Sequence, residues 1–177
     1  MKKFIQELEL SELSYEELIP KTESDKHYGR HILCLHPFEC VLLNWPTGVE
    51  SGIHDHQGMY GYVWMLEGEL DNVFYKEEEG KLIQQSIQSF GRGKLIPEPD
   101  GVIHKLKNNS TTKRAISLHF YYPALENLDG MRLFNVETGD IGILSDQAQT
   151  ACWDEQAGHF KEVHRGAFEY VPLVVQD

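Results

Sequence analysis

The chain has 177 residues, 41% of them hydrophobic and 25% charged, which is enough for one domain with a sizeable core. Its formal net charge of −12 repels nucleic-acid phosphates and anionic lipid surfaces, so we expect neither nucleic acid nor a membrane as a partner. Glu7, Glu9 and Glu12 stand where a signal peptide would be apolar, and no apolar run approaches the ~20 residues of a membrane span.

The beginning of the chain is expected to form a short helical cap. Ser14 is a candidate N-cap, Glu17 follows three residues later, and Leu13 and Leu18 have the spacing of a hydrophobic staple. Pro20 should end this helix early, because proline lacks the backbone N–H that the next turn needs.

From residue 31 onward the chain consists of short segments rich in β-branched and aromatic residues, separated by turn-forming residues. The segments predicted to be strands are 31–36, 40–45, 62–70, 71–76, 81–87, 93–97, 102–107, 114–122 and 131–136. Strands of this length and spacing are typical of an antiparallel sandwich or barrel. We therefore expect an all-β fold in which one domain covers 1–177. It comprises a helical N-terminal cap (1–30), a β-barrel (31–145) and a C-terminal tail packing on the barrel (146–177).

His54 and His56 are the first candidate metal ligands. Residues two apart on a strand share a face, so both imidazoles can reach one point in space while Asp55 faces the other way. An isolated His-x-His pair is a weak signal, because two polar residues on a solvated strand face have the same spacing.

The surroundings of this pair make the signal stronger. Residues at fixed spacing before and after it are Gly48, Gly61, Gly68, Gly93, Pro99, Gly101, His104 and Asn108. They resemble the two cupin motifs, G(x)5HxH(x)4E(x)6G and G(x)5PxG(x)2H(x)3N, except that Gly61 stands where the glutamate ligand belongs. The resemblance implies a cupin, a small β-barrel or jelly roll, in which His54, His56 and His104 bind one metal ion.

The missing glutamate has a chemical consequence. Three neutral histidines leave a divalent ion with its full charge and, in octahedral geometry, with three adjacent open positions. Non-haem Fe(II) oxygenases use such a facial arrangement but supply one carboxylate. A site without its own anion favours a substrate that brings one, and a thiolate is a soft ligand that suits iron.

Four further stretches, 28–33, 44–45, 51–56 and 117–123, resemble the type I cysteine dioxygenases of the thiol dioxygenase branch, especially the bacterial members. The resemblance covers roughly residues 25 to 145. Members oxidise L-cysteine with O2 to cysteine sulfinic acid, using Fe(II) on three histidines. The resemblance therefore implies an oxidoreductase that incorporates both atoms of O2, with one Fe(II) per chain and L-cysteine and O2 as its small-molecule partners.

The resemblance also implies roles for residues outside the histidine ligands. Those expected to bind or line the substrate are Arg30, which would hold its carboxylate, Tyr28 and Trp45. Those expected to be catalytic form a hydrogen-bonded triad beside the substrate: Ser117, His119 and Tyr121. The three triad residues alternate along one predicted strand and so share a face. Taken singly, a strand tyrosine or a lone arginine is more often a packing or surface residue.

Gly61 also marks a departure within that family. Mammalian members carry at this position a cysteine that forms a thioether with the catalytic tyrosine, whereas bacterial members resemble this chain in carrying glycine. We therefore expect Tyr121 to remain an unmodified phenol.

Three alternatives stay open at the level of sequence. The chain could be a 3-mercaptopropionate dioxygenase, although in those enzymes the position of Arg30 usually holds glutamine. It could be a non-catalytic metal-binding cupin, or a zinc or nickel cupin with hydrolase or isomerase activity. Three cysteines without CxxC spacing are typical of a reducing compartment, so we expect a cytoplasmic protein, as a monomer or weak homodimer.

Overall fold

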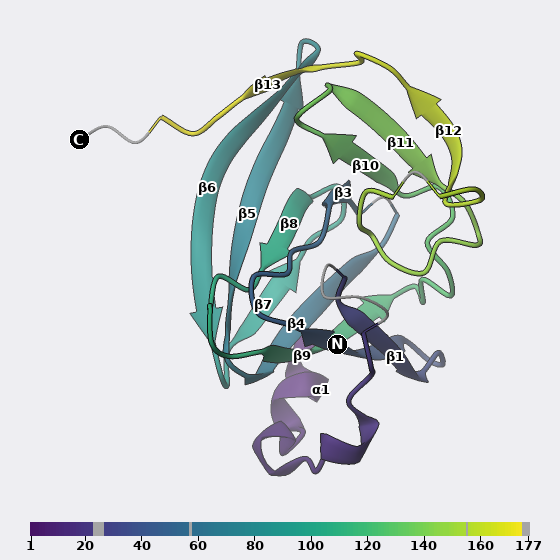
Figure 1. Cartoon of the computed structure of the whole chain (residues 1–177). Coiled ribbons are helices and arrows are strands. Elements are labelled where there is room, and N and C mark those ends of the chain that lie inside the picture. The colour runs from purple at the N-terminus through teal and green to yellow at the C-terminus, as the bar shows by residue number, and fades with distance from the viewer. Residues whose placement is uncertain (23–26, 57, 155, 175–177) are drawn as a thin grey trace.

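The computed structural model describes residues 1–22, 27–56, 58–154 and 156–174, and in this part of the chain two curved β-sheets face each other (Figure 1). The strands of the first sheet are, in order, β1 (Gly29–Cys34), β2 (Glu39–Trp45), β9 (Ala115–Tyr122), β4 (Tyr60–Glu67) and β7 (Leu95–Glu98). Those of the second are β12 (Phe160–His164), β11 (Asp140–Leu144), β10 (Arg132–Asn135), β3 (Ile53–Asp55), β8 (Ile103–Lys107), β5 (Glu69–Glu78), β6 (Lys81–Gly91) and β13 (Glu169–Val171). The all-β prediction is confirmed.

Strand β9 runs through the middle of the first sheet and is buried on both faces. Its alternate residues Ile116, Leu118 and Phe120 pack outward against the N-terminal cap. The intervening polar residues, among them His119 and Tyr121, therefore point toward the second sheet. Because both faces are covered, this strand can place polar side chains in the interior without exposing its apolar ones.

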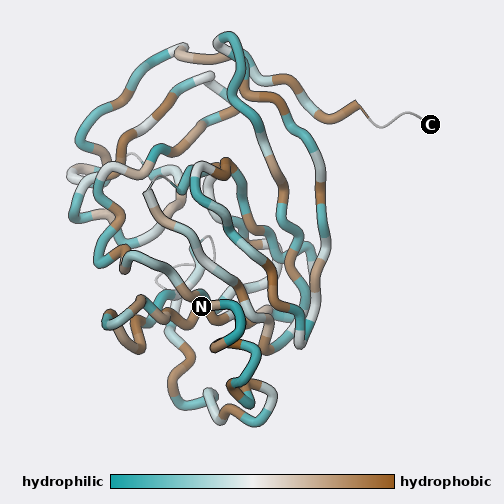
Figure 2. Tube along the Cα trace, turned by 180° about the vertical axis from the view of Figure 1, so that it is seen from behind, coloured by the Kyte–Doolittle hydropathy of each residue, from teal (hydrophilic) through white to brown (hydrophobic). Residues whose placement is uncertain are grey.

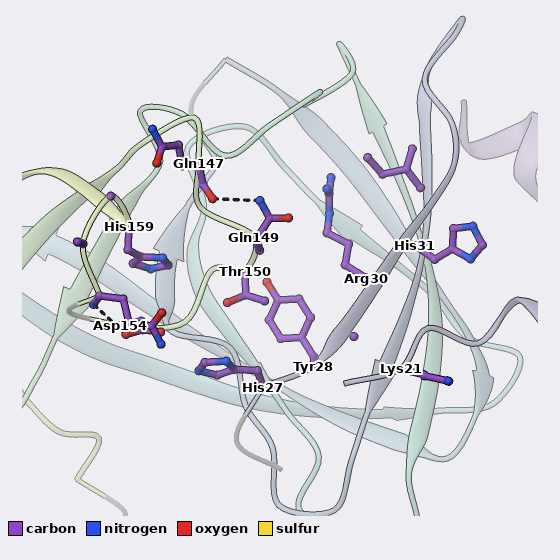
Figure 3. A pocket seen from close by; sticks show the side chains of 15 residues that line it. Lys21, His27, Tyr28, Arg30, His31, Gln147, Gln149, Thr150, Asp154 and His159 are labelled. Atoms are coloured by element: carbon purple, nitrogen blue, oxygen red, sulfur yellow. Dashed lines mark hydrogen bonds between the residues drawn. The ribbon is translucent and has the colours of Figure 1, made fainter. Parts of the chain in front are cut away.

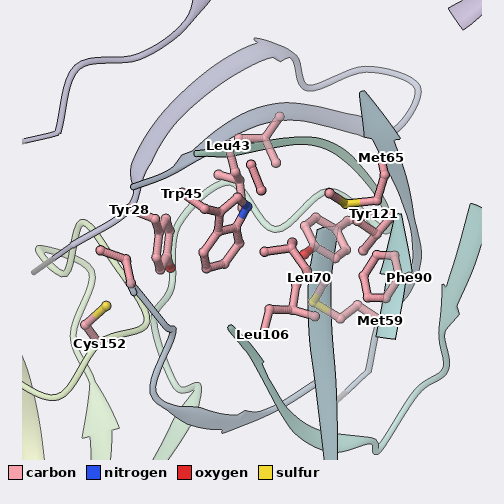
Figure 4. Packing of buried hydrophobic residues seen from close by; sticks show 14 residues of the cluster. Tyr28, Leu43, Trp45, Met59, Met65, Leu70, Phe90, Leu106, Tyr121 and Cys152 are labelled. Carbon is pink, nitrogen blue, oxygen red and sulfur yellow. The ribbon is translucent and has the colours of Figure 1, made fainter. Parts of the chain in front are cut away.

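The space between the sheets holds an apolar cluster (Figure 4). Leu43 and Met65 enter it from the first sheet, and Leu70 and Leu106 from the second. Burying each such side chain contributes roughly 1.5–3 kcal/mol to folding. The long strands at the right of Figure 2 alternate hydrophobic and hydrophilic residues, as expected for strands with one inward face.

The N-terminal cap consists of α1 (Lys2–Glu7) and two short 3-10 turns, η1 (Leu10–Glu12) and η2 (Glu16–Leu18). The helix predicted from a capping box at Ser14 is wrong. Tyr15 is the N-cap of a single three-residue turn without a side-chain cap, and the expected staple residue Leu18 is exposed. Pro20 limits the segment to a few residues, and so short a helix forms too few hydrogen bonds to offset the free-energy cost of nucleation. Residues 23–26 of the predicted cap lie outside the described residues.

Three strand predictions needed correction. No strand was predicted at residues 140–144, where the structure has β11. The predicted strand 62–70 is divided into β4 and β5 by Gly68, whose φ of +74° lies in the left-handed region that favours glycine. The C-terminal tail, in which no strand was predicted, adds β12 antiparallel to β11 and β13 parallel to β6. Among the described residues, no helix is long and apolar enough to cross a membrane.

Candidate metal centre

The structure brings His54, His56 and His104 together inside the barrel. His54 on β3 is the direct cross-strand neighbour of His104 on β8, and His56 follows β3 by one residue. Nε2 of His56 lies 3.1 Å from Nε2 of His54 and 3.0 Å from Nε2 of His104. All three side chains are buried. Asp55 faces away, as expected, and forms an ion pair with Arg132.

Neighbouring acceptors fix which nitrogen of two histidines carries the proton. Nδ1 of His54 donates to the Gly52 carbonyl at 2.9 Å, and Nδ1 of His104 donates to Oδ1 of Asn72 at 2.8 Å. The Nε2 lone pairs are therefore free to point inward. Burial lowers the pKa of His54 and holds the pKa values of His56 and His104 well below the ordinary value, so the rings are neutral, as metal binding requires.

The spacing of these nitrogens fits one metal ion. Ligand nitrogens about 2.1 Å from an ion lie about 3.0 Å apart when they meet at a right angle. The two Nε2 separations of 3.1 and 3.0 Å match this value. Lone pairs at such distances repel one another unless a cation lies between them. The donor set therefore fits a divalent transition metal bound on one face by three imidazoles.

A hydrogen-bonded chain leads from Trp45 to Tyr121 beside this centre. Nε1 of Trp45 donates to Oγ of Ser117 at 2.9 Å. Oγ of Ser117 lies 2.9 Å from Nε2 of His119, whose Nδ1 lies 2.8 Å from the Tyr121 hydroxyl. Because Trp45 can only donate, every group is satisfied when Ser117 donates to His119 and His119 donates to Tyr121. The hydrogen of the Tyr121 hydroxyl is then directed away from His119, on the side where the carboxyl group of Glu98 lies.

Tyr121 packs directly on the backbone of Gly61. A Cβ at position 61 would lie 2.5 Å from Cδ1 of Tyr121 and 2.7 Å from the carbonyl oxygen of Phe120. The ring of Tyr121 also lies against that of His56, with centroids 5.6 Å apart. Burial raises the pKa of Tyr121 well above its ordinary value, so the phenol stays protonated. Glycine at position 61 is thus what allows the tyrosine to approach the histidines.

Arg30 on β1 is mostly buried and forms an ion pair with the fully buried Glu39 on β2. The other carboxylate oxygen of Glu39 accepts a hydrogen bond from the Leu125 backbone at 2.7 Å. Nη2 of Arg30 donates to Glu39, and a guanidinium has five N–H donors, so within the described part of the chain donors remain for a ligand. Glu39 therefore anchors the arginine without saturating it.

Arg30 and Tyr28 line a cavity of about 660 Å³ whose opposite wall is formed by residues from 147–154 and 156–159 (Figure 3). The Tyr28 hydroxyl accepts a hydrogen bond from the Ala151 backbone at 2.7 Å, and its ring packs against that of Trp45 in a tilted arrangement with centroids 4.6 Å apart. The lining of this cavity includes none of the three histidines. The C-terminal tail thus lines the cavity beside Arg30, which no motif in the sequence indicated.

Sequence reasoning missed one further buried acid, Glu98 at the end of β7. Its side chain is 1% exposed, and neither carboxyl oxygen has a hydrogen-bond partner of good geometry among the described residues. Burial raises its pKa to about 8, an effect that the nearby Tyr121 hydroxyl only partly opposes. The sequence feature that could have indicated it is an acidic residue directly after the apolar stretch LIP in the second motif.

Comparison with solved structures supports the fold. The chain is similar to TT1209 from Thermus thermophilus, with a TM-score of 0.51 and 18% identity, over 64% of this chain and 98% of that one. It is also similar to oxalate oxidase in complex with a substrate analogue, glycolate, with a TM-score of 0.51 and 14% identity over 65% and 60% of the two chains. At these identities the likeness concerns the fold alone, and it confirms the cupin prediction.

Comparison of sequences identifies the family. Cysteine dioxygenase type 1 from Danio rerio is 30% identical over 108 residues, and the human protein of that name is 27% identical over 106. Each alignment covers 58% of this chain and 52% of the relative, so the chain spans about half the length of the curated relatives it matches. The family model of cysteine dioxygenase type I matches residues 25–132, more than half of the 177 residues. This chain belongs to the cysteine dioxygenase type I family.

Proposed function

We propose that this chain is a non-haem iron thiol dioxygenase that converts L-cysteine and O2 to cysteine sulfinic acid. Membership of the family supports a dioxygenase with a bound metal. The observation that carries the proposal is the convergence of three neutral imidazoles at 3.0–3.1 Å beside the hydrogen-bonded chain that ends at Tyr121. A protein that merely stored a metal would not need that chain.

The metal would be one Fe(II), held by Nε2 of His54, His56 and His104. Iron, when bound, supplies the redox chemistry with O2 that no amino-acid side chain can provide. The protein contributes neutral ligands, a buried position and fixed ring orientations. The bonds from His54 to Gly52 and from His104 to Asn72 hold two of the rings in place, as partners of metal ligands commonly do.

Arg30 would bind the carboxylate of the substrate. Its guanidinium is anchored by Glu39 and faces a cavity large enough for an amino acid. A hydrogen bond to a charged group is worth roughly 1.5–3 kcal/mol, which is about ten- to a hundredfold in binding. Tyr28 and Trp45 would form the adjoining wall, since the two rings pack against each other and Tyr28 lines the cavity.

Tyr121 would position a proton beside the reacting sulfur and oxygen atoms. The chain from Trp45 through Ser117 and His119 ends on the phenol oxygen, so the phenol O–H is left to donate elsewhere, to Glu98 in this structure and to the substrate in the proposed complex. Burial keeps that proton in place, because it raises the pKa of Tyr121 well above its ordinary value. Tyr121 and His119 would thus orient and hold a proton, and Ser117 would fix the ring of His119.

The test is to load the protein anaerobically with Fe(II) and to add O2 with L-cysteine or with 3-mercaptopropionate in parallel. We expect one O2 consumed per sulfinate formed, detected by mass, with L-cysteine as the better substrate and His104→Ala inactive. A preference for 3-mercaptopropionate would leave the dioxygenase activity as proposed but would show that the proposed substrate is wrong. Metal binding without product from either thiol would instead indicate a non-catalytic cupin.

We also propose a cytoplasmic location, which the unpaired Cys34, Cys40 and Cys152 support.

A further inference from the structure

One residue of the C-terminal tail, Ala151, contacts two parts of the candidate site. Its backbone N–H donates to the Tyr28 hydroxyl at 2.7 Å, and its carbonyl oxygen accepts a hydrogen bond from the Gly52 backbone N–H at 2.6 Å. Figure 3 shows the Tyr28 hydroxyl facing the tail beside Thr150. Tyr28 lines the cavity next to Arg30, and Gly52 directly precedes β3. Ala151 thus joins the wall of the cavity to the start of the strand that carries His54.

Gly52 in turn orients one of the candidate metal ligands. Its carbonyl oxygen accepts the hydrogen bond from Nδ1 of His54 at 2.9 Å, which leaves Nε2 facing the other histidines. Partners of this kind fix the rings of metal ligands, and their loss typically costs about 10–100-fold in metal affinity. The same glycine is held on its N–H side by Ala151. A continuous path of hydrogen bonds therefore leads from Tyr28 through the tail to His54.

The contact between the tail and Gly52 is also closely packed. A Cβ at position 52 would lie 2.9 Å from the carbonyl oxygen of Ala151 and 3.6 Å from Cα of Cys152, and both are backbone atoms. Cys152 belongs to the apolar cluster that contains Tyr28 (Figure 4), and its Sγ lies 3.7 Å from the Glu50 carbonyl oxygen. Ala151 and Cys152 are both buried. Undocking this segment would therefore leave buried polar groups without partners, at about 1–3 kcal/mol for each group.

We propose that residues 150–152 form a brace in which Ala151 is a positioning residue. Its N–H holds Tyr28 at the cavity, and its carbonyl holds Gly52, whose own carbonyl sets the orientation of the His54 ring. The brace lies outside residues 25–132, which the family model matches. A part of the chain beyond that match thus connects the wall of the substrate cavity to a metal ligand.

This inference rests on the metal centre of the proposed function. If the brace holds His54, docking of the tail and binding of the metal are linked, and each strengthens the other by the same factor. The competing role of residues 150–152 is packing alone, which would stabilise the fold without any link to the metal. The two roles differ in whether the tail responds to the metal and whether Tyr28 affects metal affinity.

The first measurement is amide hydrogen exchange of the full chain with and without Co²⁺, followed by mass spectrometry of peptides from 147–154. We expect Co²⁺ to slow exchange within residues 150–152. Strand β13 is the internal control, because it also belongs to the tail but pairs with β6 at the far edge of the second sheet. Its exchange should be equal in both states. This measurement uses the unaltered protein, so it does not depend on the folding of a variant.

The second measurement is the affinity for Co²⁺, by competition with a coloured chelator. Tyr28→Phe removes only the hydroxyl that accepts the hydrogen bond from Ala151. We expect it to bind Co²⁺ roughly three- to tenfold more weakly, which is less than the loss of a direct partner of a ligand costs. Tyr170→Phe is the matched control, because Tyr170 also lies in the tail and its hydroxyl donates to Gln84 at 2.7 Å. Its affinity for Co²⁺ should be unchanged.

The outcomes separate the brace from the metal centre. If the unaltered protein binds no stoichiometric Co²⁺, both are refuted. If it binds one Co²⁺ and exchange within residues 150–152 is the same with and without the ion, only the brace fails. An unchanged affinity in Tyr28→Phe would likewise overturn the brace. So would equal losses in Tyr28→Phe and Tyr170→Phe, because the effect would then be one of general stability.

Discussion

Substituting Gly61 by alanine should displace Tyr121 and destabilise the fold. The new Cβ would lie 2.5 Å from Cδ1 of Tyr121, about 0.9 Å short of the 3.4 Å at which ordinary contacts begin (3.4 minus 2.5 Å). It would also lie 2.7 Å from the Phe120 carbonyl oxygen, which belongs to the neighbouring strand and cannot rotate away. Overpacking of this kind costs about 1–3 kcal/mol. For a chain of this size that lowers Tm by roughly 2–12 °C, measurable by thermal melting followed by circular dichroism.

Gly91→Ala is the matched control, because Gly91 is also a strand glycine. The nearest atom to a Cβ at Gly91 is 3.6 Å away, so alanine fits there without displacement. It should be neutral or stabilise by up to about 1 kcal/mol, through the smaller entropy of the unfolded chain. The reasoning is refuted if Gly61→Ala melts at the same temperature as Gly91→Ala. Turnover should also fall in Gly61→Ala, since the phenol is pushed from its place.

Three further predictions concern the centre and its surroundings. Tyr121→Phe should retain one metal ion per chain by elemental analysis while lowering turnover roughly 10–100-fold, and loss of the ion would contradict a position outside the ligand set. Glu39→Gln should raise KM for L-cysteine more than it lowers kcat, because Arg30 loses its anchor; an unchanged KM would count against that anchoring role. Addition of metal at a hundred times Kd should stabilise the protein by about 2.7 kcal/mol, and His54→Ala should abolish this gain in a melting experiment.

The local sequence pattern was sufficient to predict the class of fold and to predict which polar residues share one face of a strand. Alternation with a period of two predicts that Ser117, His119 and Tyr121 share a face, and the structure links them in one hydrogen-bonded chain. The same period, with the spacing of the surrounding glycines, predicted the approach of His54 to His56. Such predictions succeed because the direction of a side chain from a strand depends only on its position along that strand.

Contacts between segments distant in sequence were decided by the tertiary structure alone. Glu98 reaches the histidines because β7 pairs with β4 in one particular register, and a slip of one residue would turn its side chain to the other face. Glu39 meets Arg30, and Ala151 meets Tyr28, only after β1 has paired with β2 and the tail has folded back on the barrel. Register and docking depend on the packing of the whole chain, so residue types and local spacing could not reveal these partners.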